Sequence, residues 1–239
     1  MKSLKKILTF AAASALTLTM GAVALTGCGG GKDFTFEAEH ATLAEPDGFV
    51  EKPNWGIKAM DLETKQEGDN ELVAIGYFSV KGMTITWKVN ASEECDASIK
   101  ICGSSTKFKQ PIKADGTAVE YAPPTYQPNA TPDEDVSGGI DELDAANCGV
   151  VLKVNGENAE MNGTLPGKEV TVKFGEFMGI YALYVSGQYT ANVKLQKGEN
   201  TIVLEVDAQQ GGGFNVDKIV VNTSAELTHT PVDNSDRMA

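Results

Sequence analysis

Near the end of the 239-residue chain stands Gly211-Gly212-Gly213-Phe214-Asn215-Val216-Asp217-Lys218-Ile219-Val220-Val221, a glycine-rich turn that runs into an apolar stretch. The valines and the isoleucine favour a β-strand. Asp217 is the exception, because a carboxylate at the start of an apolar strand needs a partner or a cation. Asp217 is therefore either a turn residue at a strand edge or a ligand that ties the last strand to an earlier part of the chain.

The best partner for Asp217 is the stretch Phe34–Ala41, close to the start of the chain. Glu37 and Glu39 stand two positions apart there, so in a strand they share one face. If the first and last strands meet, three carboxylates converge, and hard oxygen ligands of this kind suit Ca²⁺. We therefore expect Glu37, Glu39 and Asp217 to form a calcium site.

Four short motifs occur in a fixed order along the chain. They are FEAEHATL at 36–43, VNG at 154–156, LQKGENTIVLEV at 195–206 and GFNVDKIVV at 213–221. In this order they resemble the carbohydrate-binding modules of families 6 and 35, over roughly 34–222. The resemblance implies a jelly-roll β-sandwich of the galactose-binding type, which binds carbohydrate without catalysis and holds a structural Ca²⁺ that cross-ties its termini.

The same resemblance implies which residues contact sugar. In these modules an Asn in the last turn binds the ligand, and Asn215 holds that place here; its alternative role is that of a turn residue with unusual backbone angles. An aromatic residue precedes the KGEN turn in the family, and no Trp stands there in this chain. Trp55 lies in a loop, where it is either an exposed platform or a buried anchor. The candidates for carbohydrate contact are Asn215, Trp55, Tyr126, Tyr181, Tyr184 and Tyr189.

The first 27 residues read as an export signal. A basic start with Lys2, Lys5 and Lys6 is followed by an apolar segment that ends at Leu25-Thr26-Gly27-Cys28. This ending resembles the lipobox of bacterial lipoproteins, which implies cleavage before Cys28 and a lipid on its sulfur. The alternative, a membrane-spanning helix, fits the small residues less well. We expect 28–33 to be a flexible tether and the protein to be anchored outside the cell membrane by lipid.

The chain is strongly acidic, with a formal net charge of −13. Removal of the signal takes away three lysines and no acids, which makes the charge −16. Such a chain is a poor binder of nucleic acid or of an anionic membrane surface. About 210 residues remain, enough for one large β domain with an insert.

The body of the chain predicts an all-β sandwich. Met83, Ile85, Trp87 and Val89 alternate with polar residues, which indicates a half-buried strand and makes Trp87 a core residue. Many short strands at such spacing are typical of a sandwich. Further strands are expected at 96–102, 148–154, 169–174, 181–185, 189–195 and 200–206, and a disordered tail is expected over 223–239.

The alternation stops between about 104 and 146, so one long inserted loop is expected there. Within it Asp133, Asp135, Ser137, Asp141 and Asp144 fall on ligand positions of an EF-hand-like loop, and a short exit helix over 141–146 would follow. Pro128 and Pro132 oppose a normal entering helix. The segment is therefore either a second calcium site or a solvated acidic loop.

No nucleophile motif, zinc motif or phosphate-binding loop occurs in the sequence, so we expect no enzymatic activity. Besides Cys28, the cysteines are Cys95, Cys102 and Cys148, and their disulfide state stays open. The sequence thus favours a lipid-anchored surface protein that binds a polysaccharide or glycoconjugate. The alternatives are a protein-interaction or structural role on the same fold, and an enzyme built around the acidic insert.

Overall fold

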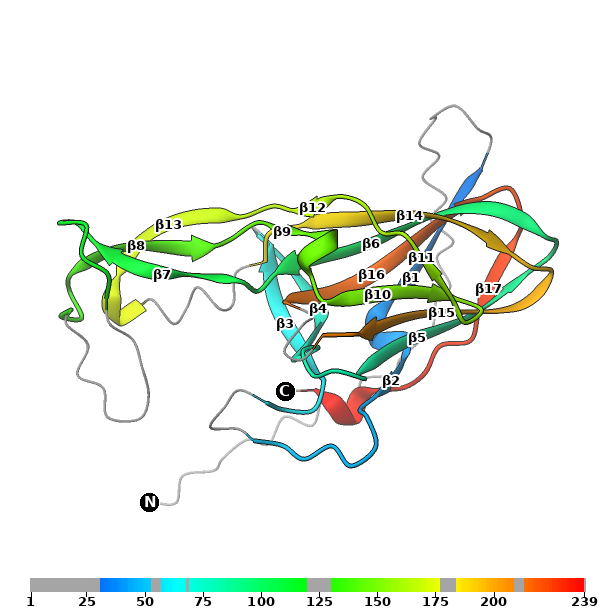
Figure 1. Ribbon diagram of the computed structural model, residues 1–239, viewed down its shortest axis with the longest axis horizontal. Helices are drawn as coiled ribbons and strands as arrows, with labels where there is room; N and C mark the ends of the chain where they lie inside the picture. The colour runs from blue at the N-terminus through cyan, green and yellow to red at the C-terminus, as the bar shows by residue number, and fades with distance from the viewer. Residues whose placement is uncertain are drawn as a thin grey trace, which may run out of the picture.

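The computed structural model describes residues 31–52, 57–67, 69–119, 130–176, 184–208 and 213–238. Two antiparallel sheets of six strands make up most of it (Figure 1). Sheet A has the order β14-β6-β16-β4-β3, with β1 on β16, and sheet B has the order β11-β10-β15-β5-β17, with β2 on β5. The prediction of an all-β sandwich is therefore confirmed.

The strands expected at 96–102, 148–154, 189–195 and 200–206 correspond to β6, β10, β14 and β15, whereas β3 and β4 were not expected and the described end of the strand expected at 181–185 is not in a strand. In sheet A the strands are β14 Gly187–Leu195, β6 Cys95–Ser105, β16 Phe214–Thr223, β4 Asn70–Gly76, β3 Asp61–Glu67 and β1 Lys32–Glu37. In sheet B they are β11 Glu157–Ala159, β10 Val150–Val154, β15 Gly198–Val206, β5 Thr84–Ala91, β17 Leu227–His229 and β2 Thr42–Ala44.

The core lies between the two sheets and contains the inward side chains of both. Met83, Ile85, Trp87 and Val89 are completely buried, as the alternation of β5 predicts. The indole Nε1–H of Trp87 donates a hydrogen bond to the carbonyl oxygen of Glu37, 3.3 Å away. Trp87 is therefore a core residue whose polar atom has a backbone partner, as buried indoles usually have.

The turn between β14 and β15 contains the KGEN motif and is closed by one buried side chain. The Asn200 amide oxygen accepts a hydrogen bond from the Gln196 N–H at 2.9 Å, and its amide nitrogen donates to the Gln196 carbonyl at 2.8 Å. Asn155 of the VNG motif donates to the same Asn200 oxygen at 2.9 Å. These two motifs therefore meet in space and have a structural role.

The insert is not an irregular loop, as the lost alternation had suggested. β8 Asp135–Ile140 pairs with β7 Phe108–Lys113 on one side and with β13 Lys168–Lys173 on the other, and we call this three-stranded sheet the extension. It has a small core of its own around Val136 and Ile140. Figure 1 shows the extension projecting from one end of the sandwich, while β1 begins at the other end. A short pair, β9 Leu143–Asp144 and β12 Thr164–Leu165, leads back to the sandwich.

The prediction of a disordered tail over 223–239 is wrong for its described part. β17 pairs with β5, and the chain then returns across the start of the fold. Asn234 donates to the carbonyls of Glu39 at 2.9 Å and Ala41 at 2.7 Å. Arg237 contacts Glu45 at 2.6 Å. The described part of the chain includes the 3₁₀ helices η1 Ala38–His40, η3 Ala145–Asn147 and η5 Ser235–Arg237.

Candidate functional site

A β-bulge in β16 determines how the late motif is presented. Val216 pairs with Gly103 of β6 and Lys218 pairs with Cys102, so Asp217 is the extra residue between them. Gly103 permits the close approach of the strands, because a Cβ there would lie 2.4 Å from the Asn215 carbonyl oxygen. The bulge brings the Asp217 carboxylate and the Lys218 ammonium together at 3.1 Å.

The first and last strands do meet, as the sequence predicts. Glu37 at the end of β1 lies opposite Lys218 of β16, and the two side chains approach to 3.9 Å. Glu39 does not share a strand face with Glu37, because the chain turns into η1 at Ala38. The expectation of two ligands on one strand is therefore wrong, although the charge of Asp217 still contributes to raising the pKa of both carboxyls.

Burial has the largest effect on the pKa values of the three carboxyls of Glu37, Glu39 and Asp217. It raises the pKa of Glu37, Glu39 and Asp217, since a carboxylate loses hydration when it is enclosed. The neighbouring Lys218 ammonium opposes this rise in the pKa of Asp217, whereas the other carboxylates add to the rise in the pKa of Glu37. The group therefore carries more negative charge than its single lysine neutralises, and an additional cation would stabilise it.

Two buried polar atoms beside these carboxylates have no hydrogen-bond partner, namely Glu39 Oε2 and the Tyr184 hydroxyl. Tyr184 is only 6% exposed. Burial, and next the negative charge of Asp217, raise the pKa of its phenol. Unsatisfied buried groups of this kind are uncommon and call for an explanation. An ion or polar ligand beside Asp217 would satisfy them.

The donor chemistry of Glu37, Glu39 and Asp217 fits Ca²⁺, which prefers carboxylate oxygens. The positions of the side chains do not yet form a cage. In the part of the chain that the structure describes, no three His, Cys, Asp or Glu side chains are grouped so that they could hold a metal ion. The Lys218 ammonium lies instead between Glu37 and Asp217.

The EF-hand-like interpretation of the insert is wrong. Residues 135–140, including Asp135 and Ser137, form strand β8, and an extended strand cannot wrap around an ion. Asp135 forms an ion pair with Lys173 at 2.7 Å. Asp141 lies 3.8 Å from the Lys109 ammonium, and Asp144 accepts a hydrogen bond from Thr164 at 2.5 Å.

The exit helix expected over 141–146 is also absent, because β9 and η3 occupy that segment. Asp133 lies in the turn before β8.

The residues predicted to contact carbohydrate differ in whether the structure leaves them accessible. Tyr189 is completely buried, donates its hydroxyl to the Leu143 carbonyl at 2.9 Å and packs edge-on against Phe214, so its proposed contact with sugar is wrong. Asn215 lies opposite Ser104 and is 5% exposed, and Tyr184 is buried as described above. Trp55, Tyr126 and Tyr181 lie outside the described residues.

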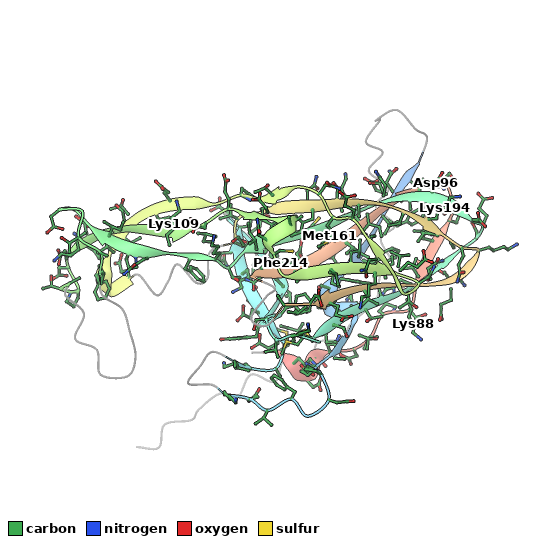
Figure 2. All side chains as sticks on the ribbon, in the orientation of Figure 1. Lys88, Asp96, Lys109, Met161, Lys194 and Phe214 are labelled. Carbon is green, nitrogen blue, oxygen red and sulfur yellow. The ribbon has the colours of Figure 1, made fainter. Side chains whose placement is uncertain are left out.

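Sequence reasoning missed a shallow, open groove on the outer face of sheet A. Its volume is about 640 Å³, and Asn192, Ser98 and Asn222 form one register row across β14, β6 and β16 in its wall. Asp96 and Lys194 line the same groove and lie near the start of β1 (Figure 2). The row could have been predicted, because each of the three residues is more exposed than its two neighbours in the strand.

Cys95, Cys102 and Cys148 are free thiols in the structure. Burial raises the pKa of Cys102 and Cys148, which makes both thiols poor nucleophiles near neutral pH. Cys28 lies outside the described residues, and within them no helix is long and apolar enough to cross a membrane.

Several solved structures are similar to this chain. A family 35 carbohydrate-binding module from Clostridium thermocellum is 17% identical, with a TM-score of 0.40, over 79% of this chain and 96% of that one. A CBM35 from Paenibacillus barcinonensis is 16% identical, with a TM-score of 0.41, over 79% and 97%. A CBM35 in complex with a disaccharide containing glucuronic acid is 12% identical, with a TM-score of 0.41, over 82% and 96%.

These modules are of the type that the four sequence motifs resemble. No protein-family model matches the chain. No curated protein matches it either.

Proposed function

We propose that this protein is a non-catalytic carbohydrate-binding protein of the bacterial cell surface. The observation that carries the proposal is the row of Asn192, Ser98 and Asn222 in the groove of sheet A. Amide side chains offer both donors and acceptors, and a hydroxyl offers both as well, which is what a ligand made of hydroxyl groups requires. Asp33 orients one of them, because it accepts a hydrogen bond from Asn222 at 2.5 Å.

The groove lies beside Gly31, only three residues after Cys28. A lipid on Cys28 would hold this end of the sandwich within roughly 10 Å of the bilayer, because an extended chain spans at most about 3.5 Å per residue. A ligand in the groove would therefore lie close to the cell surface. This position suits a cell-envelope polysaccharide or glycoconjugate.

We further propose that Ca²⁺ stabilises the fold through Glu37, Glu39 and Asp217. What supports this is that Glu37 of β1 and Asp217 of β16 approach the same Lys218 ammonium, and that the buried Glu39 Oε2 atom has no partner. The ion would tie η1 to β16 and raise stability by mass action. It would have no catalytic part.

The decisive experiment is a glycan-array and polysaccharide-pulldown screen of the purified protein, run with Ca²⁺ and again with chelator. Asn192→Ala and Asn222→Ala test the groove, and Asn215→Ala tests the position that the family resemblance favours. Lys88→Ala, on the outer face of sheet B, is the matched control. Binding that only the groove variants abolish supports the proposal, whereas binding that only Asn215→Ala abolishes places the sugar elsewhere.

A protein-interaction role is the second candidate, and the extension favours it. This sheet projects from the end of the sandwich opposite the start of β1, so a lipid anchor would place it far from the membrane (Figure 1). Its outer face carries ion pairs such as Lys109–Glu169 at 2.8 Å and Lys173–Asp135 at 2.7 Å. Folded protein that binds no glycan across a broad panel would favour this role.

A further inference from the structure

Strand β13 forms one edge of the extension (Figure 1). β8 pairs with one side of it, and among the described residues no strand pairs with the other side. The backbone N–H and C=O groups along such an edge can pair with a further strand. The opposite edge, β7, is a poorer template, because Pro111 in its middle has no N–H to donate.

The side chains of β13 are complementary to a second copy of the same strand. On the face turned away from the small core of the extension, Glu169 and Lys173 lie two positions on either side of Thr171. On the other face, Val170 and Val172 pack against that core. A two-fold axis through Thr171 would place Glu169 opposite Lys173 of the second copy. It would also place the two valines opposite each other, so both faces of the strand match.

We propose that two copies of this chain associate through their β13 strands, which pair antiparallel about Thr171 and join the two extensions into one six-stranded sheet. The same surface is used by both copies, so each favourable pair occurs twice. The association does not depend on carbohydrate binding, and it gives the protein-interaction role a definite partner.

Two ion pairs within one copy support this register. Lys109 donates to Glu169 at 2.8 Å across Gly139, which lies between them in β8 and has no side chain. Lys173 lies opposite Asp135 of β8 and pairs with it at 2.7 Å. Joining two copies would place one pair of each kind end to end, in a row that alternates in charge: Lys109 and Glu169 of one copy, then Lys173 and Asp135 of the other. Opposite charges on neighbouring strands stabilise a sheet.

Other registers lose this match. An axis through Val170 places Glu169 opposite Thr171, and an axis through Val172 places Lys173 opposite Thr171. An axis between two residues puts the apolar face of one copy beside the charged face of the other. Charged residues commonly protect an edge strand from pairing. In β13 their order instead makes the edge complementary to itself.

The test measures self-association of the purified protein by sedimentation velocity over a concentration series. The unmodified protein should form a dimer as its concentration rises. Glu169→Lys and Lys173→Glu each put like charges opposite one another in both pairs, so each variant alone should dimerise about tenfold more weakly. An equimolar mixture of the two variants should dimerise as well as the unmodified protein, because opposite charges again face each other in both pairs. Glu157→Lys and Lys88→Glu make the same charge reversals on exposed residues of the sandwich and should stay within about threefold of the unmodified protein.

Thr171→Cys gives a second reading. Directly opposite residues in antiparallel strands have Cα atoms about 4.5–5.5 Å apart, which a disulfide can span. A mild oxidant should therefore join two copies of Thr171→Cys, and it should not join two copies of Thr64→Cys, a change of an exposed threonine in β3. A protein that stays monomeric and forms no Thr171→Cys disulfide would overturn the proposal. A dimer that neither charge reversal weakens, or that the mixture does not restore, would also overturn it, because that dimer would use another surface.

Discussion

The indole N–H of Trp87 donates to the carbonyl oxygen of Glu37, and this bond joins the centre of the core to the last residue of β1. The backbone of Glu37 is therefore held by packing that needs no metal. Asp217, by contrast, depends on the bulge in β16 for its direction. The two sides of the proposed calcium site are thus fixed by different means, and Asp217 is the more informative residue to change.

Replacement of Asp217 by Ala should abolish the response of the protein to Ca²⁺. At a free Ca²⁺ concentration one hundred times the dissociation constant, the unmodified protein should gain about 2.7 kcal/mol, and the variant should gain nothing. Differential scanning fluorimetry with Ca²⁺ and with chelator measures both. Glu157→Ala, an exposed acid on β11, is the control and should keep the full response. A chelator shift that persists in Asp217→Ala would show that Asp217 is not a main ligand.

The acidic residues of the insert should not contribute to the stabilisation of the protein by Ca²⁺. Asp135 is engaged by Lys173, and Asp144 by Thr164, in a geometry that belongs to a sheet and not to an ion-binding loop. The triple change Asp133→Asn, Asp135→Asn and Asp144→Asn should therefore leave the chelator-induced change in melting temperature unaltered. Overall stability should fall by no more than about 1 kcal/mol, because surface ion pairs contribute little. A smaller chelator shift would restore the second calcium site.

Strands with one buried face were predictable from the sequence, because burial imposes a period of two. β5, β14 and β15 all show it, and in β14 this alternation puts Tyr189 on the same face as Ala191 and Leu195, which are buried. The family resemblance pointed to Tyr189 as a sugar contact, and the simpler period-two rule was the better guide. The same rule predicts that Asn192 lies on the opposite, exposed face of β14.

The bulge, the extension strands β7 and β8 and the C-terminal segment were not predictable in this way, although β13 of the extension was expected at 169–174. The period of two breaks at Asp217, and a bulge is defined only by the partner strand, which here lies more than one hundred residues earlier. β8 contains Gly138 and Gly139, which weaken any strand pattern, yet it pairs on both sides with β7 and β13. β17 has only three residues, too few for a period to show.

The ion pair between Glu45 and Arg237 should make stability depend on pH. The hydrogen bond from Arg237 lowers the pKa of Glu45 below its ordinary value of 4.5. A carboxyl whose pKa is lower in the folded state stabilises the fold above its ordinary pKa and loses that contribution as pH falls through the lowered value. Glu45→Gln should therefore destabilise by about 1 kcal/mol at pH 7, and the difference should vanish well below pH 4.5.

Urea unfolding at several pH values measures this difference. Glu71→Gln removes an exposed acid of β4 and serves as the control, with a difference from the unmodified protein below about 0.5 kcal/mol throughout. If the loss in free energy of unfolding caused by Glu45→Gln stays constant down to pH 3, the Glu45 side chain stabilises the fold by packing and not by charge.

Asn234 should connect the C-terminal segment to the proposed calcium site. It is buried, and its amide donates to the carbonyls of Glu39 and Ala41, the two residues that flank His40 in and just after η1. Asn234→Ala leaves both carbonyls without this donor, so stability should fall by about 1–3 kcal/mol. Because η1 carries Glu39, the Ca²⁺ affinity should fall as well. Ser235→Ala, on the exposed neighbour, should change neither quantity. If Asn234→Ala lowers stability but leaves Ca²⁺ affinity intact, the segment supports the sandwich alone, and Glu39 either is held by the rest of η1 or is no ligand.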